Sequence, residues 1–277
     1  MFLKDPYSFS GNDIPEKDIF FTENDPEREY RKIVNYSFLY TGITFMISFF
    51  LAGNIARTLP ADAENKLLYF LKDFIAGSVF FLPVAAAAVI TRKRENKRYE
   101  ACNKNFLPLL PSPVPQRKKL LLLFTGTFLC GILLQIPVLF LGAVQKSIFQ
   151  LLGIELPPQE KVAMIAKLLE NGNNFLPLLF LIIPPLFFAP LAEELFFRLI
   201  LFDKLNLYMK KEYSFWGTNI LFALLHGNIA AFLPLLLVGC ICQKVYLKTS
   251  SLLAAILLHT GFNLSTILLM SISHAVK

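Results

Sequence analysis

The stretch Ala192-Glu193-Glu194-Leu195-Phe196-Phe197-Arg198 decides how this chain is interpreted. It places two carboxylates and a guanidinium inside a segment, Phe175–Phe202, that is otherwise apolar enough to cross a bilayer. A charged residue at the middle of a bilayer costs about 2.5–3.5 kcal/mol on insertion scales, so three cost roughly 8–10 kcal/mol if ion pairing is ignored. Ionisable residues in membrane segments usually serve a function, and we treat this stretch as a candidate site.

The composition is that of an integral membrane protein. Of the 277 residues 55% are hydrophobic, 28 are Phe and only 17% are charged, against about 25% charged in soluble domains. Long apolar runs that contain Gly and Pro predict helices rather than barrel strands. We therefore expect an all-α fold, a polytopic membrane bundle of about seven or eight transmembrane helices. The candidate spans are Tyr36–Ala56, Phe74–Thr91, Leu120–Ala143, Phe175–Phe202, Ser214–His226, Ile229–Leu247 and Leu252–Ile272.

Three regions are expected along the chain. Residues 1–35 are polar and charged, without the apolar core of a signal peptide, and predict a cytoplasmic N-terminal tail with little fixed structure. Residues 36–174 form an N-terminal transmembrane region, in which the amphipathic stretch Gln159–Glu170 predicts an interfacial or capping helix. Residues 175–272 form the membrane core that carries the candidate site. Within it, Ser214–His226 is short for a full crossing, which takes about 20 residues.

Positive charge is concentrated in the loop 92–119. The formal net charge is +7, and this loop holds nine bases against the two acids Glu95 and Glu100. Nucleic-acid binding is one explanation of such a cluster, but short basic loops of membrane proteins stay in the cytoplasm, and this explanation fits better. We therefore expect no nucleic acid partner, a cell (inner) membrane location with the N-terminus in the cytoplasm, and contact of the loop with anionic membrane lipid. The four Cys are expected to be small buried hydrophobes.

The two carboxylates are expected to differ in role. Glu194 and Arg198 are four residues apart, so they share a helix face and can pair. Glu193 is rotated by about 100° and points elsewhere. Such a division makes one carboxylate structural and leaves the other available as a base. The alternative is a purely structural ion-pair cluster. Pro190 either begins the helix that carries these residues or kinks it.

Two histidines lie in membrane segments at a comparable depth. His226 ends the short segment, and His259 shares a helical face with Asn263, four residues later. Counting about 1.5 Å per residue from the expected cytoplasmic ends places the Glu pair, His226 and His259 roughly 13–18 Å into the bilayer. Structural polar residues that act independently need not agree in depth, so we expect these side chains to meet.

The motifs Glu-Glu-x-x-x-Arg at 193–198, Phe-x-x-x-His at 222–226 and His-x-x-x-Asn at 259–263 resemble those of the CPBP family, the CAAX-protease and bacteriocin-processing (Abi) intramembrane proteases. The resemblance covers roughly residues 175–270 and implies an intramembrane endopeptidase acting on a membrane-associated peptide or protein, prenylated or signal-peptide-like. Members of the family usually have about eight spans, against the seven counted here.

The resemblance also implies roles for the site residues. Glu193 and His226 would activate a water, His259 and Asn263 would bind the oxyanion, and Glu194 and Arg198 would hold the helix. Members have been described both as metalloproteases and as metal-free glutamate proteases, so a divalent metal such as zinc at Glu193, His226 and His259 stays open. Two other functions compete with the protease: a non-catalytic membrane scaffold or immunity protein of the same fold, and a proton-coupled transporter.

Overall fold

The computed structural model describes residues 26–58, 66–94, 116–154 and 175–275, which form helices and no strand. The first half contains α1 (Pro26–Thr58), α2 (Lys66–Arg94), α4 (Arg117–Leu133) and α5 (Gln135–Leu151). The second half begins with one continuous helical run made of α7 (Phe175–Ile183), η1 (Pro184–Phe188), α8 (Ala189–Glu194), η2 (Leu195–Leu201) and α9 (Phe202–Asn206). It ends with α10 (Lys211–Leu225), η3 (Ile229–Ala231), α11 (Phe232–Thr249) and α12 (Leu252–Ala275).

The all-α polytopic membrane fold is confirmed. Six stretches of the described residues are long and apolar enough to cross a membrane: Arg28–Arg57, Phe70–Arg94, Arg117–Leu151, Leu178–Asn206, Ile229–Thr249 and Leu252–Leu269. The seventh expected span, Ser214–His226, corresponds to the 15-residue α10, which is shorter than a crossing requires. The expected helix at Gln159–Glu170 and most of the basic loop lie outside the described residues.

Two boundaries differ from expectation. The third span is longer than Leu120–Ala143, because α4 and α5 follow each other with helical backbone at Leu134. Helix α1 begins at Pro26, so residues 26–35 belong to it rather than to a tail without fixed structure. Contacts explain the earlier start: Ile33 and Val34 are each only 1% exposed, and Asn35 accepts hydrogen bonds from Lys204 and Tyr208. Polar composition alone did not reveal these contacts.

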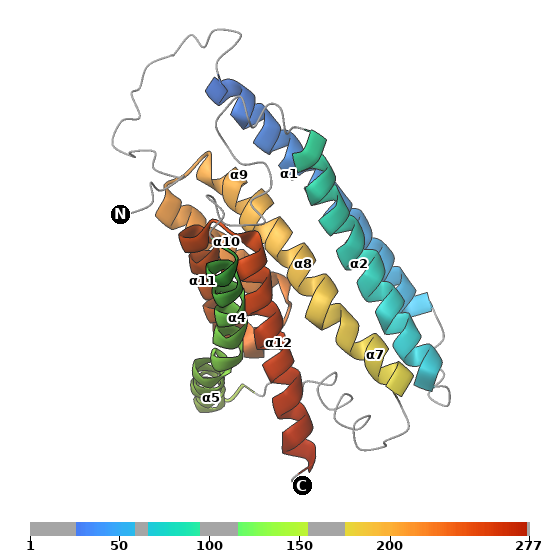
Figure 1. Ribbon diagram of the computed structural model, residues 1–277. Helices are drawn as coiled ribbons and strands as arrows, with labels where there is room; N and C mark the ends of the chain where they lie inside the picture. The colour runs from blue at the N-terminus through green and yellow to red at the C-terminus, as the bar shows by residue number, and fades with distance from the viewer. Residues whose placement is uncertain (1–25, 59–65, 95–115, 155–174, 276–277) are drawn as a thin grey trace.

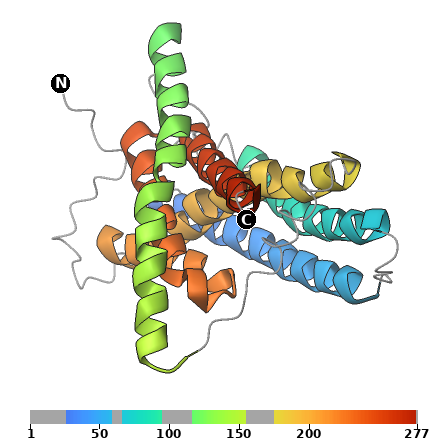
Figure 2. The same ribbon diagram turned by 90° about the horizontal axis from the view of Figure 1, so that it is seen from below.

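The continuous run from α7 to α9 lies at the centre of the molecule (Figure 1). Helices α1 and α2 are antiparallel and cover one side of it, and α10, α11 and α12 lie on the other. The view from below shows α4 and α5 as a long element beyond α12, away from α1 and α2 (Figure 2). The largest apolar cluster surrounds the central run and includes Leu195, Phe196, Leu199, Ile200 and Phe222. The two candidate glutamates thus lie on the helical run that this cluster surrounds.

Helices α4 and α12 approach each other through two glycines. A Cβ added to Gly131 would lie 2.0 Å from the carbonyl oxygen of Leu258, and one added to Gly261 would lie 2.3 Å from that of Phe128. Neither position has room for a methyl group, because the atoms that it would meet belong to the facing backbone. Close backbone approach through small residues is a usual way for membrane helices to associate. The contact fixes the depth of α12, which carries His259.

Replacing Gly131 with alanine should therefore loosen α12. We expect a stability loss of about 1–3 kcal/mol, the usual cost of an overpacked contact, measured by thermal unfolding in detergent. Gly126→Ala is the matched control on α4, since no atom of another described segment lies within 4 Å of the Cβ it would add. Equal stability of the two variants would contradict the close contact.

A proline in the central run explains a second attachment of α12. Pro190 has no N–H to donate. In an α-helix its partner would be the carbonyl of Leu186, four residues earlier, and in a π-helix the carbonyl of Pro185, five residues earlier, so both carbonyls need another donor. The run adopts π geometry just before it, in η1. Helix α12 supplies replacements: Thr260 Oγ1 donates to Leu186 O at 3.1 Å, and Asn263 Nδ2 donates to Pro185 O at 2.7 Å. Pro190 lies in the first turn of α8, as one of the two expectations had it, but the chain before it is also helical.

Candidate active site

The buried carboxylate of Glu194 is paired as expected. Arg198 Nε donates to Glu194 Oε2 at 2.8 Å, and both side chains are 0% exposed. Arg198 Nη1 also donates to Asn219 Oδ1 on α10 at 2.9 Å and to Gln243 Oε1 on α11 at 3.2 Å. One guanidinium therefore connects three helices at the level of the Glu pair.

Glu194 also fixes the first imidazole. Its second oxygen, Oε1, lies 3.0 Å from Nδ1 of His259. Because an ionised carboxylate can only accept, Nδ1 carries the proton, and Nε2 of the ring faces away from Glu194. The His259 side chain is 5% exposed, so its orientation is set by the protein rather than by solvent. Glu194 thus orients one histidine while it pairs with Arg198.

Glu193 faces both imidazoles. Its Oε2 lies 3.8 Å from Nε2 of His226 and 3.8 Å from Nε2 of His259, and its side chain is 16% exposed. Both separations exceed hydrogen-bond length, and this buried oxygen has no hydrogen-bond partner among the described residues. Segments that are distant in sequence therefore bring three polar atoms to one place, as the depth count predicted.

Local structure holds His226 at the end of α10. His226 is the C-cap residue, and Gly227 follows with φ +63°, the left-handed conformation that ends many helices. The ring atom Nδ1 lies 2.7 Å from the carbonyl oxygen of Phe222. A carbonyl only accepts, so Nδ1 is the donor and the lone pair of the neutral ring lies on Nε2, toward Glu193. His226 is the most exposed of the three groups, at 30% of its side chain.

A buried aromatic ring contacts both histidines and Arg198. Phe222 is 0% exposed, and its centroid lies 4.7 Å from the ring of His226 and 6.0 Å from that of His259. The guanidinium carbon of Arg198 lies 5.3 Å from the same centroid. Such cation–ring and ring–ring contacts are each worth about 0.5–2 kcal/mol. The ring therefore fixes the separation of the two imidazoles.

Asn263 contacts the central run rather than the Glu pair or the histidines in the described part of the chain. One N–H of its amide donates to Pro185 O, as described above. An asparagine amide has a second N–H and an acceptor oxygen. The expected role as an oxyanion donor therefore depends on that second N–H, and the first serves to join α12 to the central run.

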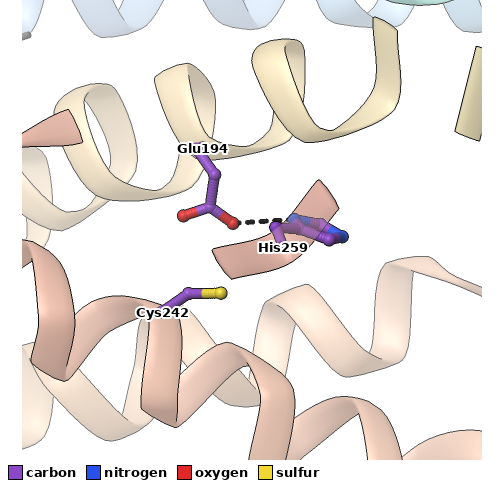
Figure 3. Close-up of side chains that lie close together, drawn as sticks. All are labelled: Glu194, Cys242 and His259. Carbon is purple, nitrogen blue, oxygen red and sulfur yellow. Dashed lines mark hydrogen bonds and ion pairs between the residues drawn. The ribbon is translucent and has the colours of Figure 1, made fainter. Parts of the chain in front are cut away.

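Cys242 lies beside the paired carboxylate. Figure 3 shows Glu194, His259 and the thiol of Cys242 converging, and their potential ligand atoms all lie within 4.8 Å of one another. Both oxygens of Glu194 already carry short contacts, and Arg198 supplies the positive charge that a metal ion would bring. The chemistry of this group fits a hydrogen-bonded support better than a metal centre. Cys240 and Cys242 are buried, as expected, whereas Cys130 is exposed.

The sequence alone assigned no role to three residues of this group. Asn219 and Gln243 contact Arg198, and Phe222 contacts both histidines. Asn219 and Gln243 are fully buried amides in apolar segments, so the signal that singled out the Glu pair also applied to them. Phe222 stood in a quoted motif, but one Phe among 28 carries no signal of its own.

Residues 175–265 match the family model described as type II CAAX prenyl endopeptidase Rce1-like. This part of the chain is similar to the CAAX protease family. The CAAX protease match includes all six candidate residues and supports a membrane endopeptidase in general. No curated protein and no solved structure matches the chain.

Proposed function

We propose that this chain is an intramembrane endopeptidase that hydrolyses a peptide bond with a water activated by Glu193 and His226. The observation that carries the proposal is the unpaired Oε2 of Glu193, 3.8 Å from Nε2 of each histidine. A water oxygen about 2.8 Å from both partners of such a pair fits between them. It would donate one hydrogen to the carboxylate and the other to the lone pair on His226.

The charges of the group support a division of roles. When ionised, Glu193 and Glu194 carry two negative charges, and Arg198 carries one positive charge. Protonation of His259 would balance the negative charge that remains. In that form Nδ1 of His259 donates to Glu194, and Nε2 is left as a donor for the oxyanion. Asn263 adds its second N–H to the same oxygen.

The reaction then proceeds in two steps. Glu193 and His226 take a proton from water as its oxygen bonds to the carbonyl carbon, and the carbonyl oxygen becomes the oxyanion held by His259 and Asn263. The tetrahedral intermediate breaks its carbon–nitrogen bond as the same pair returns the proton to the amine. Protons balance, and no covalent enzyme intermediate is needed.

A zinc ion at Glu193, His226 and His259 is the alternative. The donors suit zinc, but ligand atoms of a tetrahedral site with zinc–ligand distances of about 2.0–2.1 Å lie roughly 3.3–3.4 Å apart. The 3.8 Å separations are wider, so the side chains would have to close by a few tenths of an ångström. The distances favour water alone. We expect the purified protein to keep its activity after exhaustive chelation; loss of activity restored by stoichiometric zinc would reverse this assignment.

The family description makes a prenylated peptide the first substrate to test. Orientation follows from charge: the N-terminal end of α1 and the C-terminal end of α2, which carries Arg92, Lys93 and Arg94, lie at the same end of the molecule (Figure 1). We place this end in the cytoplasm of the cell membrane, since basic segments stay inside. Anionic lipid would be attracted to the same end.

The function is tested in two assays with the wild-type protein and Glu193→Ala. Purified protein in liposomes is given a prenylated CAAX peptide, and the membrane proteomes of cells that express either form are compared. Peptides released only by the wild type, in either assay, support an endopeptidase, and the first assay decides whether it accepts prenyl groups. Identical products from both forms, or none, would reject the proposed function.

A further inference from the structure

Gln145 lies on α5, outside the segment that matches the family model, yet it contacts the chain that follows His226. It is 4% exposed in a helix whose other side chains are mostly apolar. A buried amide in a membrane segment is costly unless its donors and acceptor are paired. Both ends of this amide are used, and both partners are backbone groups of the same short segment.

The side chain bridges two positions four residues apart. Gln145 Nε2 donates to the carbonyl oxygen of Ile229, and the N–H of Leu233 donates to Gln145 Oε1 at 2.9 Å. In a regular helix this carbonyl and this N–H would bond to each other. Here η3 ends and α11 begins between them. The amide of Gln145 takes the place of the bond between Leu233 N–H and Ile229 O, and it satisfies the N–H of Leu233 in the first turn of α11.

This junction lies close to His226 along the chain. Ile229 is three residues after His226, and the only residues between them are Gly227, which has positive φ, and Asn228. Asn228 bonds within the same turn, because its Oδ1 accepts from the N–H of Ala230 at 3.0 Å. The loop is therefore held by α10 at one end and by Gln145 at the other.

We propose that Gln145 is a positioning residue for the hydrolysis: it anchors the loop after α10 and so keeps Nε2 of His226 in line with Glu193. The inference rests on the proposed function. It assigns a part in catalysis to the N-terminal region, which the family match does not reach. Since a misplacement of about 1 Å can cost roughly 100-fold in rate, loss of this anchor should lower kcat with little change in KM.

The test compares three variants of the full chain in liposomes. Gln145→Met keeps the length of the side chain but pairs with neither backbone group, and we expect kcat to fall by about 100-fold. Gln145→Glu provides a conditional rescue, because a protonated carboxyl has one donor and one acceptor, like the amide. Its activity relative to wild type should rise as the pH falls, whereas that of Gln145→Met should not. Gln150→Ala, at an exposed position on the same helix, should match wild type.

Hydrogen exchange separates this inference from the proposed function. In Gln145→Met the amide of Leu233 should exchange faster, while the amides of α12 around His259 keep their wild-type rates. Faster exchange together with the kcat loss and the pH-dependent rescue supports the inference. A Gln145→Met protein with kcat within about twofold of wild type overturns it, even if exchange changes. An inactive wild type rejects the proposed function instead, whatever the exchange rates.

Discussion

Glu193→Gln should lower kcat by roughly 1000-fold or more and leave the protein folded. The amide is close to the carboxylate in size but cannot take a proton from water, and general base catalysis contributes about 100- to 10,000-fold. Folding should survive because Glu193, unlike Glu194, has no short contact in the described part of the chain. The measurement is the rate of peptide release by purified protein, with thermal unfolding recorded in parallel.

His226→Ala should act in the same way, since the two groups share the water. Glu212→Gln is a suitable control: this glutamate is exposed in the first turn of α10, away from the histidines, and its loss should leave the rate unchanged. A Glu193→Gln protein that cleaves at the wild-type rate would rule out the proposed chemistry.

Arg198→Met should cause the largest loss of stability. The change leaves Glu194 without its cation at 0% exposure and removes the bonds to Asn219 and Gln243. Breaking a buried pair by removing one partner costs about 3–5 kcal/mol, because the remaining charge is buried without compensation. Unfolding in detergent, by heat or denaturant, measures the loss.

The double variant Glu194→Gln/Arg198→Met distinguishes burial of a lone charge from loss of packing. We expect it to be more stable than Arg198→Met alone, since no charge is left unpaired. Lys32→Met is the surface control: it removes the exposed pair with Glu29 at 3.0 Å and should cost less than about 1 kcal/mol. If Arg198→Met were as mild as Lys32→Met, the buried pair would not support the fold.

Charge in apolar segments was enough to predict the membrane fold and the meeting of the site residues. The spacing of Glu194 and Arg198 predicted their ion pair, and comparable depth predicted that both histidines would face the Glu pair; the structure confirms both contacts. The catalytic roles themselves stay predictions. Helix periodicity indicates which residues share a face, and the rise per residue indicates which residues share a depth in the bilayer. Together they were sufficient to predict these contacts.

Contacts between distant segments could not be predicted from the sequence. Gln145 and the glycines of α4 and α12 depend on which helices are neighbours, and hydropathy does not determine this. Among the described residues six stretches qualify as spans; the seventh expected segment, Ser214–His226, corresponds to the 15-residue α10, which is shorter than a crossing requires. The early start of α1 depends on Lys204 and Tyr208, which are far away in the chain.

The attachment of α12 to the proline-interrupted run has a consequence for biogenesis. Synthesis proceeds from the N-terminus, so α12 follows every other described helix out of the ribosome. Until it inserts, the carbonyls of Pro185 and Leu186 lack the donors that Asn263 and Thr260 provide. In lipid an unsatisfied backbone group costs several kcal/mol, so the nascent chain is destabilised at these two carbonyls, which lie a few residues before Glu193 and Glu194. Insertion of α12 supplies these donors and brings His259 to the acidic pair in the same event, so under the proposed function a chain without α12 would lack both.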